Sequence, residues 1–165
     1  MAKLSHYARR GAVRMVDVSA KPQTARIARA HGFIRISREA LRLIKRLKTP
    51  KGNPLEIARI AGIAGAKRTA DLIPLCHPLL LTNIEVTAKF QPGGIEIRSE
   101  VRTTGPTGVE MEALTAVAVA ALTIYDMCKA VDRQMEIGKI HLQEKLGGAS
   151  GRFLRRAEAT RRKGN

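Results

Sequence analysis

The sequence predicts an α+β fold of the ferredoxin-like type, a split βαβ sandwich in which helices cover one face of an antiparallel sheet. Three observations predict it. Segments with strand and helix periodicity follow one another in the order strand, helices, strand, strand, helix, strand. The two central strands are joined by Pro92-Gly93-Gly94, a hairpin signal. The chain has 165 residues, 44% of them hydrophobic, which suits one globular domain.

The first elements are predicted to be a strand and a helix. Over residues 22–36 apolar residues alternate with arginines and alanines, which indicates a long strand, although the alanines would also tolerate a helix. Ser37 suits the N-cap of a helix over residues 37–48, where leucine and isoleucine recur at helical spacing.

A second helix is predicted over residues 54–72, because proline at position 54 suits a first helical turn. Gly62 and Gly65 lower its helix propensity but permit a close approach of another backbone. Residues 73–81 contain two prolines and are expected to form a rigid loop. Alternating residues then predict strands over residues 83–91 and 95–103.

The longest helix is predicted from a capping box, with Thr107 at the N-cap and Glu110 at the third helical position, to about Val131. Its middle is apolar on nearly all sides, so most of its surface should be buried. Alternation over residues 135–145 indicates a last strand. A sheet with one open face beside such an apolar helix favours self-association, and we expect an oligomer.

Positive charge is concentrated at the two ends of the chain. Of the formal net charge of +16, four charges lie in residues 1–14 and five in residues 152–165. We therefore divide the chain into a basic N-terminal arm (1–14), a single folded domain (15–151) and a basic C-terminal tail (152–165). Basic arms indicate an anionic partner. Nucleic acid is disfavoured, because single-strand readers use clustered aromatic platforms and the five aromatic residues here are scattered.

Other classes of protein and site are disfavoured by composition. Two cysteines, Cys76 and Cys128, have no paired spacing, so we expect no disulfide framework and reduced thiols in a cytoplasmic protein. The sequence has no unbroken run of about 18 apolar residues and no signal-peptide pattern, so we expect no membrane association. The four histidines have unrelated spacings and no HExxH motif is present, so we expect no metal held by the protein.

Two lysines and a Cys-His pair are the first candidates for chemistry. A lysine in a loop, such as Lys51, is usually solvated surface. Lys67 follows Gly65, but the spacing is not that of a phosphate-binding loop. Cys76 is interpreted as a small buried hydrophobic residue. His77 lies in the proline-bracketed loop, and its fixed backbone suits a positioned hydrogen-bonding group.

Two acidic clusters lie on the long helix. Glu110 and Glu112 lie in its first turn, where the helix dipole alone could explain them. Asp126 and Lys129 are three residues apart near its end and could form an ordinary intrahelical ion pair. Because Glu112 and Asp126 are 14 residues apart, they lie about 21 Å apart along a straight helix. If both clusters act on one small substrate, each site must combine residues from two subunits.

Four segments resemble a known family over most of residues 15–151. The chain is similar to the cyclic pyranopterin monophosphate synthase family of molybdenum-cofactor biosynthesis, and GGASG at residues 147–151 fits as well. The segments are MVDVSAK (15–21), ARIAGIAGAKRTADLIPLCHPLLL (58–81), TGVEMEALTAV (107–117) and AALTIYDMCKAVD (120–132).

The resemblance implies a lyase that converts 3′,8-cyclo-7,8-dihydroguanosine 5′-triphosphate to cyclic pyranopterin monophosphate and releases pyrophosphate. It also implies a ferredoxin-like catalytic domain and a hexamer, a trimer of dimers with active sites between subunits. No cofactor is implied beyond magnesium that can accompany the triphosphate. A nucleotide substrate would give the positive charge an anionic small molecule as its partner.

The resemblance also implies roles for individual residues. Asp126 would be the catalytic acidic residue, and Lys51 and Lys129 would transfer protons or steer phosphates. Lysine suits proton transfer where neighbouring cations and desolvation lower its pKa. The implied substrate-binding residues are Leu75, Cys76, His77, Glu110, Met111 and Glu112, with Lys67, Lys145 and Arg26 as further candidates for the triphosphate.

Two other functions remain as alternatives at this point. A basic RNA-associated protein would use the folded middle only as a scaffold for its arms, but acidic residues such as Glu112 and Asp126 oppose it. A catalytically silent oligomer could merely bind a nucleotide. The presence of both Lys51 and Lys129 makes that alternative weaker.

Overall fold

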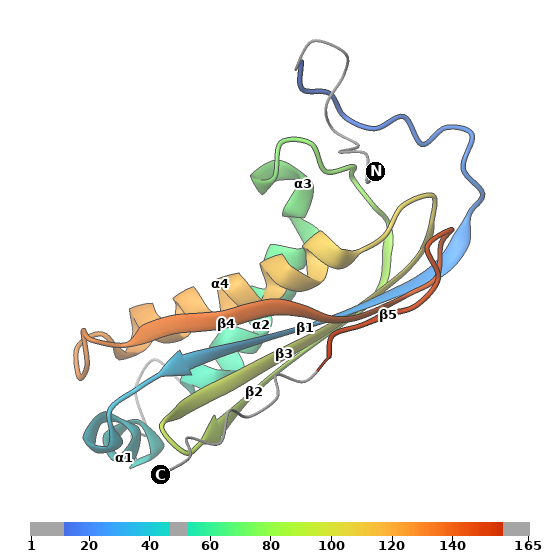
Figure 1. Cartoon of the computed structure of the whole chain (residues 1–165). Coiled ribbons are helices and arrows are strands. Elements are labelled where there is room, and N and C mark those ends of the chain that lie inside the picture. The colour runs from blue at the N-terminus through green and yellow to red at the C-terminus, as the bar shows by residue number, and fades with distance from the viewer. Residues whose placement is uncertain (1–11, 47–52, 157–165) are drawn as a thin grey trace.

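The computed structural model describes residues 12–46 and 53–156, and its described part forms one five-stranded antiparallel sheet with helices, confirming the predicted ferredoxin-like class. The strand order is β2-β3-β1-β4-β5 (Figure 1). Lys51 and the outer parts of both basic arms lie outside the described residues. The elements in chain order are β1 (Thr24–Arg35), α1 (Arg38–Arg46), α2 (Pro54–Lys67), α3 (Thr69–Leu72), β2 (Leu81–Gln91), β3 (Gly94–Gly105), α4 (Glu110–Cys128), β4 (Glu136–Leu146) and β5 (Phe153–Leu154).

Strand β1 is the centre of the sheet, because it pairs antiparallel with β3 on one side and β4 on the other. Successive side chains of β1 point to opposite faces of the sheet, so its alternating residues form one buried face and one open face. Ala28, Ala30 and Ile34 are fully or almost fully buried toward the helices. Strand β3 contributes Ile95, Ile97 and Val101 to the same core, all with no exposed surface.

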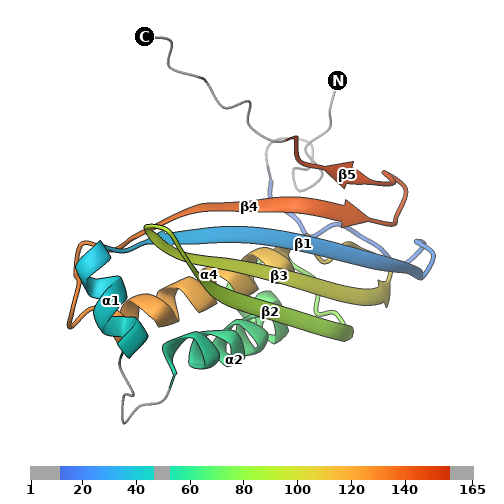
Figure 2. The same cartoon turned by 90° about the horizontal axis from the view of Figure 1, so that it is seen from below.

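Helices α2 and α4 lie side by side across one face of the sheet (Figure 2). The predicted close approach at the glycines of α2 is confirmed. A side chain at Gly62 would lie 2.8 Å from the Ala116 carbonyl oxygen, and one at Gly65 would lie 2.8 Å from a Val119 methyl group. These contacts leave no room for a Cβ atom, so glycine sets how closely the two helices pack.

Helix α1 lies at the end of the sheet, near the turn between β2 and β3 (Figures 1 and 2). The predicted N-cap is confirmed, because the Ser37 hydroxyl oxygen accepts a hydrogen bond from the backbone N–H of Ala40 at 3.2 Å. The Asp132 carboxylate accepts from the Ser37 N–H at 3.0 Å. Leu41 and Ile44 are buried and attach α1 to the core.

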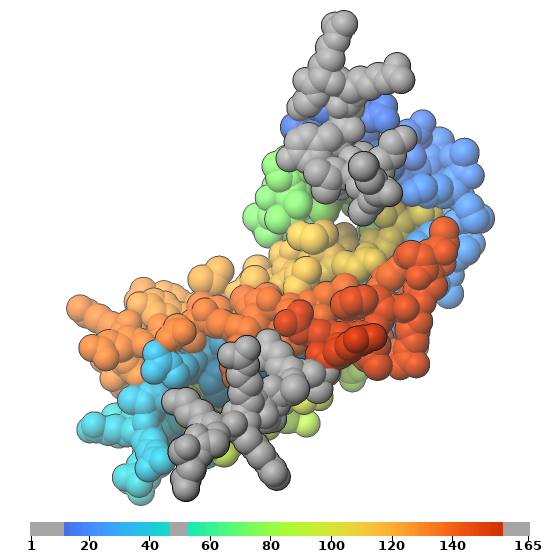
Figure 3. All heavy atoms as spheres, viewed as in Figure 1, coloured from blue at the N-terminus to red at the C-terminus, as the bar shows by residue number. Residues whose placement is uncertain are grey.

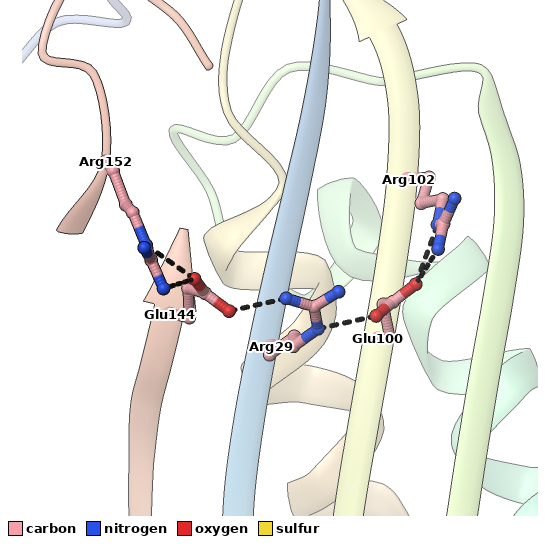
Figure 4. A network of polar contacts seen from close by, with 5 residues as sticks. All are labelled: Arg29, Glu100, Arg102, Glu144 and Arg152. Carbon is pink, nitrogen blue, oxygen red and sulfur yellow. Dashed lines mark hydrogen bonds and ion pairs between the residues drawn. The ribbon is translucent and has the colours of Figure 1, made fainter. Parts of the chain in front are cut away.

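The face of the sheet opposite the helices has a row of ion pairs. Arg102, Glu100, Arg29, Glu144 and Arg152 alternate in charge from β3 across β1 and β4 to the residue before β5 (Figure 4). The Arg29 guanidinium bridges the two carboxylates. Burial alone would raise the pKa of Glu100, but hydrogen bonds from Arg102 and Arg29 outweigh it and lower that pKa. Hydrogen bonds from Arg29 and then Arg152 lower the pKa of Glu144 against a smaller effect of burial.

Several predicted boundaries were wrong. The capping box does not form: Val109 is the N-cap of α4, and no side chain caps that end. Val109 is 1% exposed, so burial of its side chain in the core fixes where the helix begins. The helix ends at Cys128, not Val131. The second predicted helix breaks at Arg68, whose N–H bonds to Gly65 and Ala66, and α3 follows.

Helix α4 is long and apolar enough to span a membrane by length and composition alone, with a mean hydropathy of 1.5. Half of this apolar stretch is buried in the domain, where α4 packs against α2 and three strands of the sheet. A core helix passes the same test, so this feature carries no argument for a membrane.

Candidate active site

Two adjoining hollows lie at the N-terminal end of α4. We name them the Cys76 hollow and the Arg26 hollow, and both include Lys21, Thr107, Gly108 and Glu110. Figure 3 shows the segment before β1, the α3 region and the start of α4 meeting at this end of the molecule. The Cys76 hollow also has Val16, Val18, Leu75, Cys76, His77, Leu79, Met111 and Glu112. The Arg26 hollow also has Pro22, Thr24, Arg26, Pro106, Lys145, Gly148, Ala149 and Ser150.

His77 fixes one wall of the Cys76 hollow. Its Nε2 atom lies 2.7 Å from the backbone carbonyl oxygen of Val16. A carbonyl oxygen only accepts, so Nε2 must carry the proton, and Nδ1 is the imidazole atom that can face a ligand. The bond ties the loop after α3 to the segment before β1, across 61 residues of sequence. The sequence prediction of a positioned hydrogen-bonding histidine is consistent with this contact.

Glu112 is the most unusual group in the site, because it is a carboxyl group with only 4% exposure. Burial, opposed in part by a backbone hydrogen bond and reinforced by the nearby charge of Glu110, raises its pKa to about 7. Glu112 can therefore exist as the neutral acid or the carboxylate near neutral pH. Burial, and then the charge of Glu112, also raises the pKa of the Cys76 thiol.

Arg26 is held in place by main-chain carbonyl groups beside its hollow. Its Nε atom donates to the Gly105 oxygen at 2.9 Å and its Nη2 atom donates to the Pro106 oxygen at 3.0 Å. Gly148 packs against the same guanidinium, and a Cβ atom there would collide with it. Gly148 also has a φ of 74°, a left-handed conformation that favours glycine.

Lys145 extends from β4 into the Arg26 hollow, where its ammonium donates to the Ser150 hydroxyl. Together with Lys21 and Arg26 it gives this hollow three cations. Among the lining residues that the structure describes, Glu110 is the one acidic residue. Several cations around one open space are what a polyphosphate requires.

The other implied catalytic pair lies at the opposite end of α4. The Lys129 ammonium donates to Asp126 Oδ1 at 2.7 Å, and the two side chains are 56% and 72% exposed. The hydrogen bond and charge of Asp126 raise the pKa of Lys129. A proton-transferring lysine is expected to have a lowered pKa. The pKa of Lys129 is instead raised within the described chain, because the group that contacts its ammonium is the acidic Asp126.

The structure thus brings together most of the implied substrate-binding residues and separates them from the catalytic pair. Lys67 is exposed at the end of α2 and lines neither hollow. Sequence reasoning missed Lys21 and Ser150 as site residues, although both lie in segments that carried the family resemblance. Among residues 12–46 and 53–156, no group of three or more metal-ligating side chains is positioned to hold a metal.

Comparisons with known proteins identify the family. Residues 15–148 match the model of the MoaC family. The chain belongs to the MoaC family. It is 58% identical, over 93% of its own length and 91% of the relative's, to "Cyclic pyranopterin monophosphate synthase 1" of Mycobacterium tuberculosis strain H37Rv.

Two further relatives carry the same kind of name. The chain is 54% identical to "Cyclic pyranopterin monophosphate synthase" of Thermomicrobium roseum, over 98% of both chains. It is 56% identical to the protein of that name from Parvibaculum lavamentivorans, over 92% of this chain and 96% of the relative. The family match covers all the lining residues of the two hollows except Ala149 and Ser150. The relatives are enzymes by name.

Proposed function

We propose that this protein is a cyclic pyranopterin monophosphate synthase. It would convert 3′,8-cyclo-7,8-dihydroguanosine 5′-triphosphate to cyclic pyranopterin monophosphate and pyrophosphate, as a lyase of molybdenum-cofactor biosynthesis. The observation that carries the proposal is the pair of adjoining hollows, which combine a buried carboxyl group with several cations in a chain of this family.

The Arg26 hollow suits the triphosphate. Lys21, Arg26 and Lys145 would neutralise phosphate charge in the ground state, and would stabilise the added charge on the leaving pyrophosphate. Arg26 is already oriented by the Gly105 and Pro106 carbonyl oxygens, so binding would cost it little side-chain entropy. We propose that magnesium, where present, accompanies the phosphates.

The Cys76 hollow suits the purine-derived ring. Leu75 and Met111 supply apolar surface, and His77 presents a ring nitrogen. In its neutral form Glu112 can donate a hydrogen bond to a ring carbonyl oxygen, and in its ionised form it can accept one from a ring N–H. A pKa of about 7 lets Glu112 adopt either form at neutral pH.

Proton transfer is proposed for Asp126, Lys129 and Lys51 of a neighbouring subunit. Asp126 and Glu112 are about 21 Å apart on one straight helix, so one small substrate cannot touch both from the same chain. We therefore propose a homo-oligomer, a hexamer built as a trimer of dimers in the cytoplasm, with each site shared by two subunits. The exposed Leu122 on α4, at 60%, is consistent with a covered helix face in that assembly.

The decisive experiment measures pyrophosphate release from the cyclic dihydro-GTP substrate. We expect turnover by the wild type and a loss of about 10²–10⁴-fold in Lys51→Ala, Asp126→Ala and Lys129→Ala, with the oligomer mass unchanged. Arg98→Ala, an exposed site on the open sheet face, is the matched control and should keep wild-type turnover. A well-folded wild type without turnover would refute the proposal.

A further inference from the structure

A third hollow lies at the other end of the sheet from the candidate active site, between α1 and the β2–β3 turn. We name it the α1 groove. It is lined by Arg38, Leu41, Arg42, Lys45, Phe90, Gln91, Pro92 and Gly93. It shares no residue with either hollow at the start of α4. Strand β3 runs from this groove to the Arg26 hollow, and its 12 residues span on the order of 35 Å.

The described lining of the groove is cationic. Arg38, Arg42 and Lys45 are exposed, and none of the lining residues that the structure describes is acidic. Within residues 12–46 and 53–156, none of these three cations forms an ion pair.

The contrast with the open sheet face is direct. There each arginine of the row in Figure 4 has a glutamate partner, so its charge is satisfied inside the protein. Three cations that share one hollow repel one another and gain most from an anion placed between them.

The three cations are arranged on one side of α1. They lie at positions i, i+4 and i+7, the spacing that places side chains on a common helix face. Leu41 is 7% exposed and forms the apolar base from which this face projects. The Lys45 ammonium lies 5.2 Å from the centre of the Phe90 ring, a cation–π contact that orients it toward the groove.

The size and lining of the groove decide what the anion is. Seven residues of helix span about 10 Å, which fits two or three linked phosphates and is short for a nucleic-acid strand. Binding of single strands uses free aromatic faces for base stacking. Phe90 is the one aromatic residue in the described lining of the groove, and its ring is in contact with Lys45.

We propose that the α1 groove binds a short polyphosphate chain, either free pyrophosphate or the phosphate tail of a nucleotide, through Arg38, Arg42 and Lys45. The site is separate from the substrate hollows of the same chain. It does not depend on the proposed reaction, because it rests on the groove alone.

The test is calorimetric titration of the full-length protein with pyrophosphate, a nucleoside triphosphate, the corresponding nucleoside and a short single-stranded oligonucleotide. For the wild type we expect pyrophosphate binding at a site that weakens about 100-fold in Arg38→Ser/Arg42→Ser, since each lost charge-assisted contact is worth about tenfold. Lys89→Ser/Arg98→Ser removes the same charge from the open sheet face and should change binding less than about twofold.

The remaining arms separate the sources of phosphate. Equal binding of pyrophosphate and the triphosphate, with no binding of the nucleoside, supports recognition of the phosphates alone; tighter binding of the triphosphate supports a nucleotide. Either result supports a site in the α1 groove only if the same binding is lost in Arg38→Ser/Arg42→Ser.

Three results would overturn the proposal: equal pyrophosphate affinity in both double variants, preference for the oligonucleotide, or loss of substrate turnover in Arg38→Ser/Arg42→Ser. The last result would assign the groove to the active site itself. Turnover by the wild type is measured in a separate assay. Failure of the proposed reaction can therefore be distinguished from a failure of the groove to bind phosphates.

Discussion

The two ends of α4 differ in how much of a site a single chain builds. At the N-terminal end Glu112 is 4% exposed and lies in a hollow whose wall is fixed by the bond from His77 to Val16. At the C-terminal end Asp126 and Lys129 are mostly exposed and contact each other. One end is preorganised and enclosed, and the other is open.

We propose that the open end becomes a complete site only when a second chain covers it. An exposed ion pair has its charges screened by water and does little to shift a proton equilibrium toward catalysis. Enclosure by a second chain would add desolvation, which lowers the pKa of a lysine.

The largest effect should come from mixing inactive variants. If each active site combines one chain's Glu112 end with another chain's Asp126 end, Glu112→Ala and Asp126→Ala should each lose about 10²–10⁴-fold in turnover. Random co-assembly of equal amounts should restore about a quarter of wild-type activity, because about a quarter of the sites would pair two intact ends.

The measurement is pyrophosphate release after co-expression or subunit exchange. Each variant assembled only with itself is the control and should stay inactive. No recovery in verified mixed oligomers would mean that both ends of α4 do not meet in one site between chains.

The second prediction concerns the buried carboxyl group. Glu112 has a pKa of about 7 in the folded protein and the ordinary 4.5 when exposed. Between these values the unfolded chain loses its proton while the folded chain keeps it, so the free energy of unfolding falls as pH rises from about 4.5 to 7 and is level above that. The accumulated loss is about 3 kcal/mol.

Glu112→Gln keeps the shape of the side chain and removes the titration. We expect the variant to be more stable than the wild type at pH 8, by up to about 3 kcal/mol, and nearly equal to it at pH 4.5. Urea unfolding at several pH values measures both. Parallel pH profiles for the two proteins would show that Glu112 is not desolvated as the structure indicates.

How far the sequence predicts this architecture depends on the kind of feature. Strand alternation placed β1, β3 and β4 within a few residues, because one face of each strand packs on helices and the other does not. Gly62 and Gly65 were predicted to be contact positions, because glycine destabilises a helix interior and is expected there where another backbone packs closely. Short β5 was missed, because two residues carry no periodicity.

The site was predicted less well than the fold, for reasons of long-range packing. The predicted capping box with Thr107 at the N-cap was wrong, because burial of Val109 decides where α4 begins. Thr107 instead lines both hollows. The burial of Glu112 has no local signal, since a glutamate in a first helical turn is usually exposed. Lys21 lines the same hollows as Glu110 only because the segment before β1 folds back to the start of α4.

The third prediction tests the preorganised end through its glycine. In Gly148→Ala the new methyl group would collide with the Arg26 guanidinium and sit at a left-handed φ of 74°. We expect KM for the substrate to rise about tenfold, as Arg26 loses its bonds to Gly105 and Pro106, and stability to fall by about 1–2 kcal/mol.

Steady-state kinetics and urea unfolding measure these two effects. Gly151→Ala is the matched control, because its φ is also positive, at 61°, but nothing lies within 4 Å of the added carbon. The control should lose stability without the change in KM. If both variants raise KM equally, then loop strain rather than Arg26 positioning is responsible.

The smallest expected effect is on the stability of the open end. Removing the exposed pair in Asp126→Asn or Lys129→Met should leave the unfolding midpoint of the protein unchanged, because exposed intrahelical pairs contribute little. Turnover should nevertheless be lost in both variants, so stability and activity separate at this end, whereas Glu112→Gln changes both. Chemical denaturation beside pyrophosphate release at one pH tests this. A large loss of stability in Lys129→Met would show that the pair supports the fold, and the distinction between the enclosed and the open end of α4 would then fail.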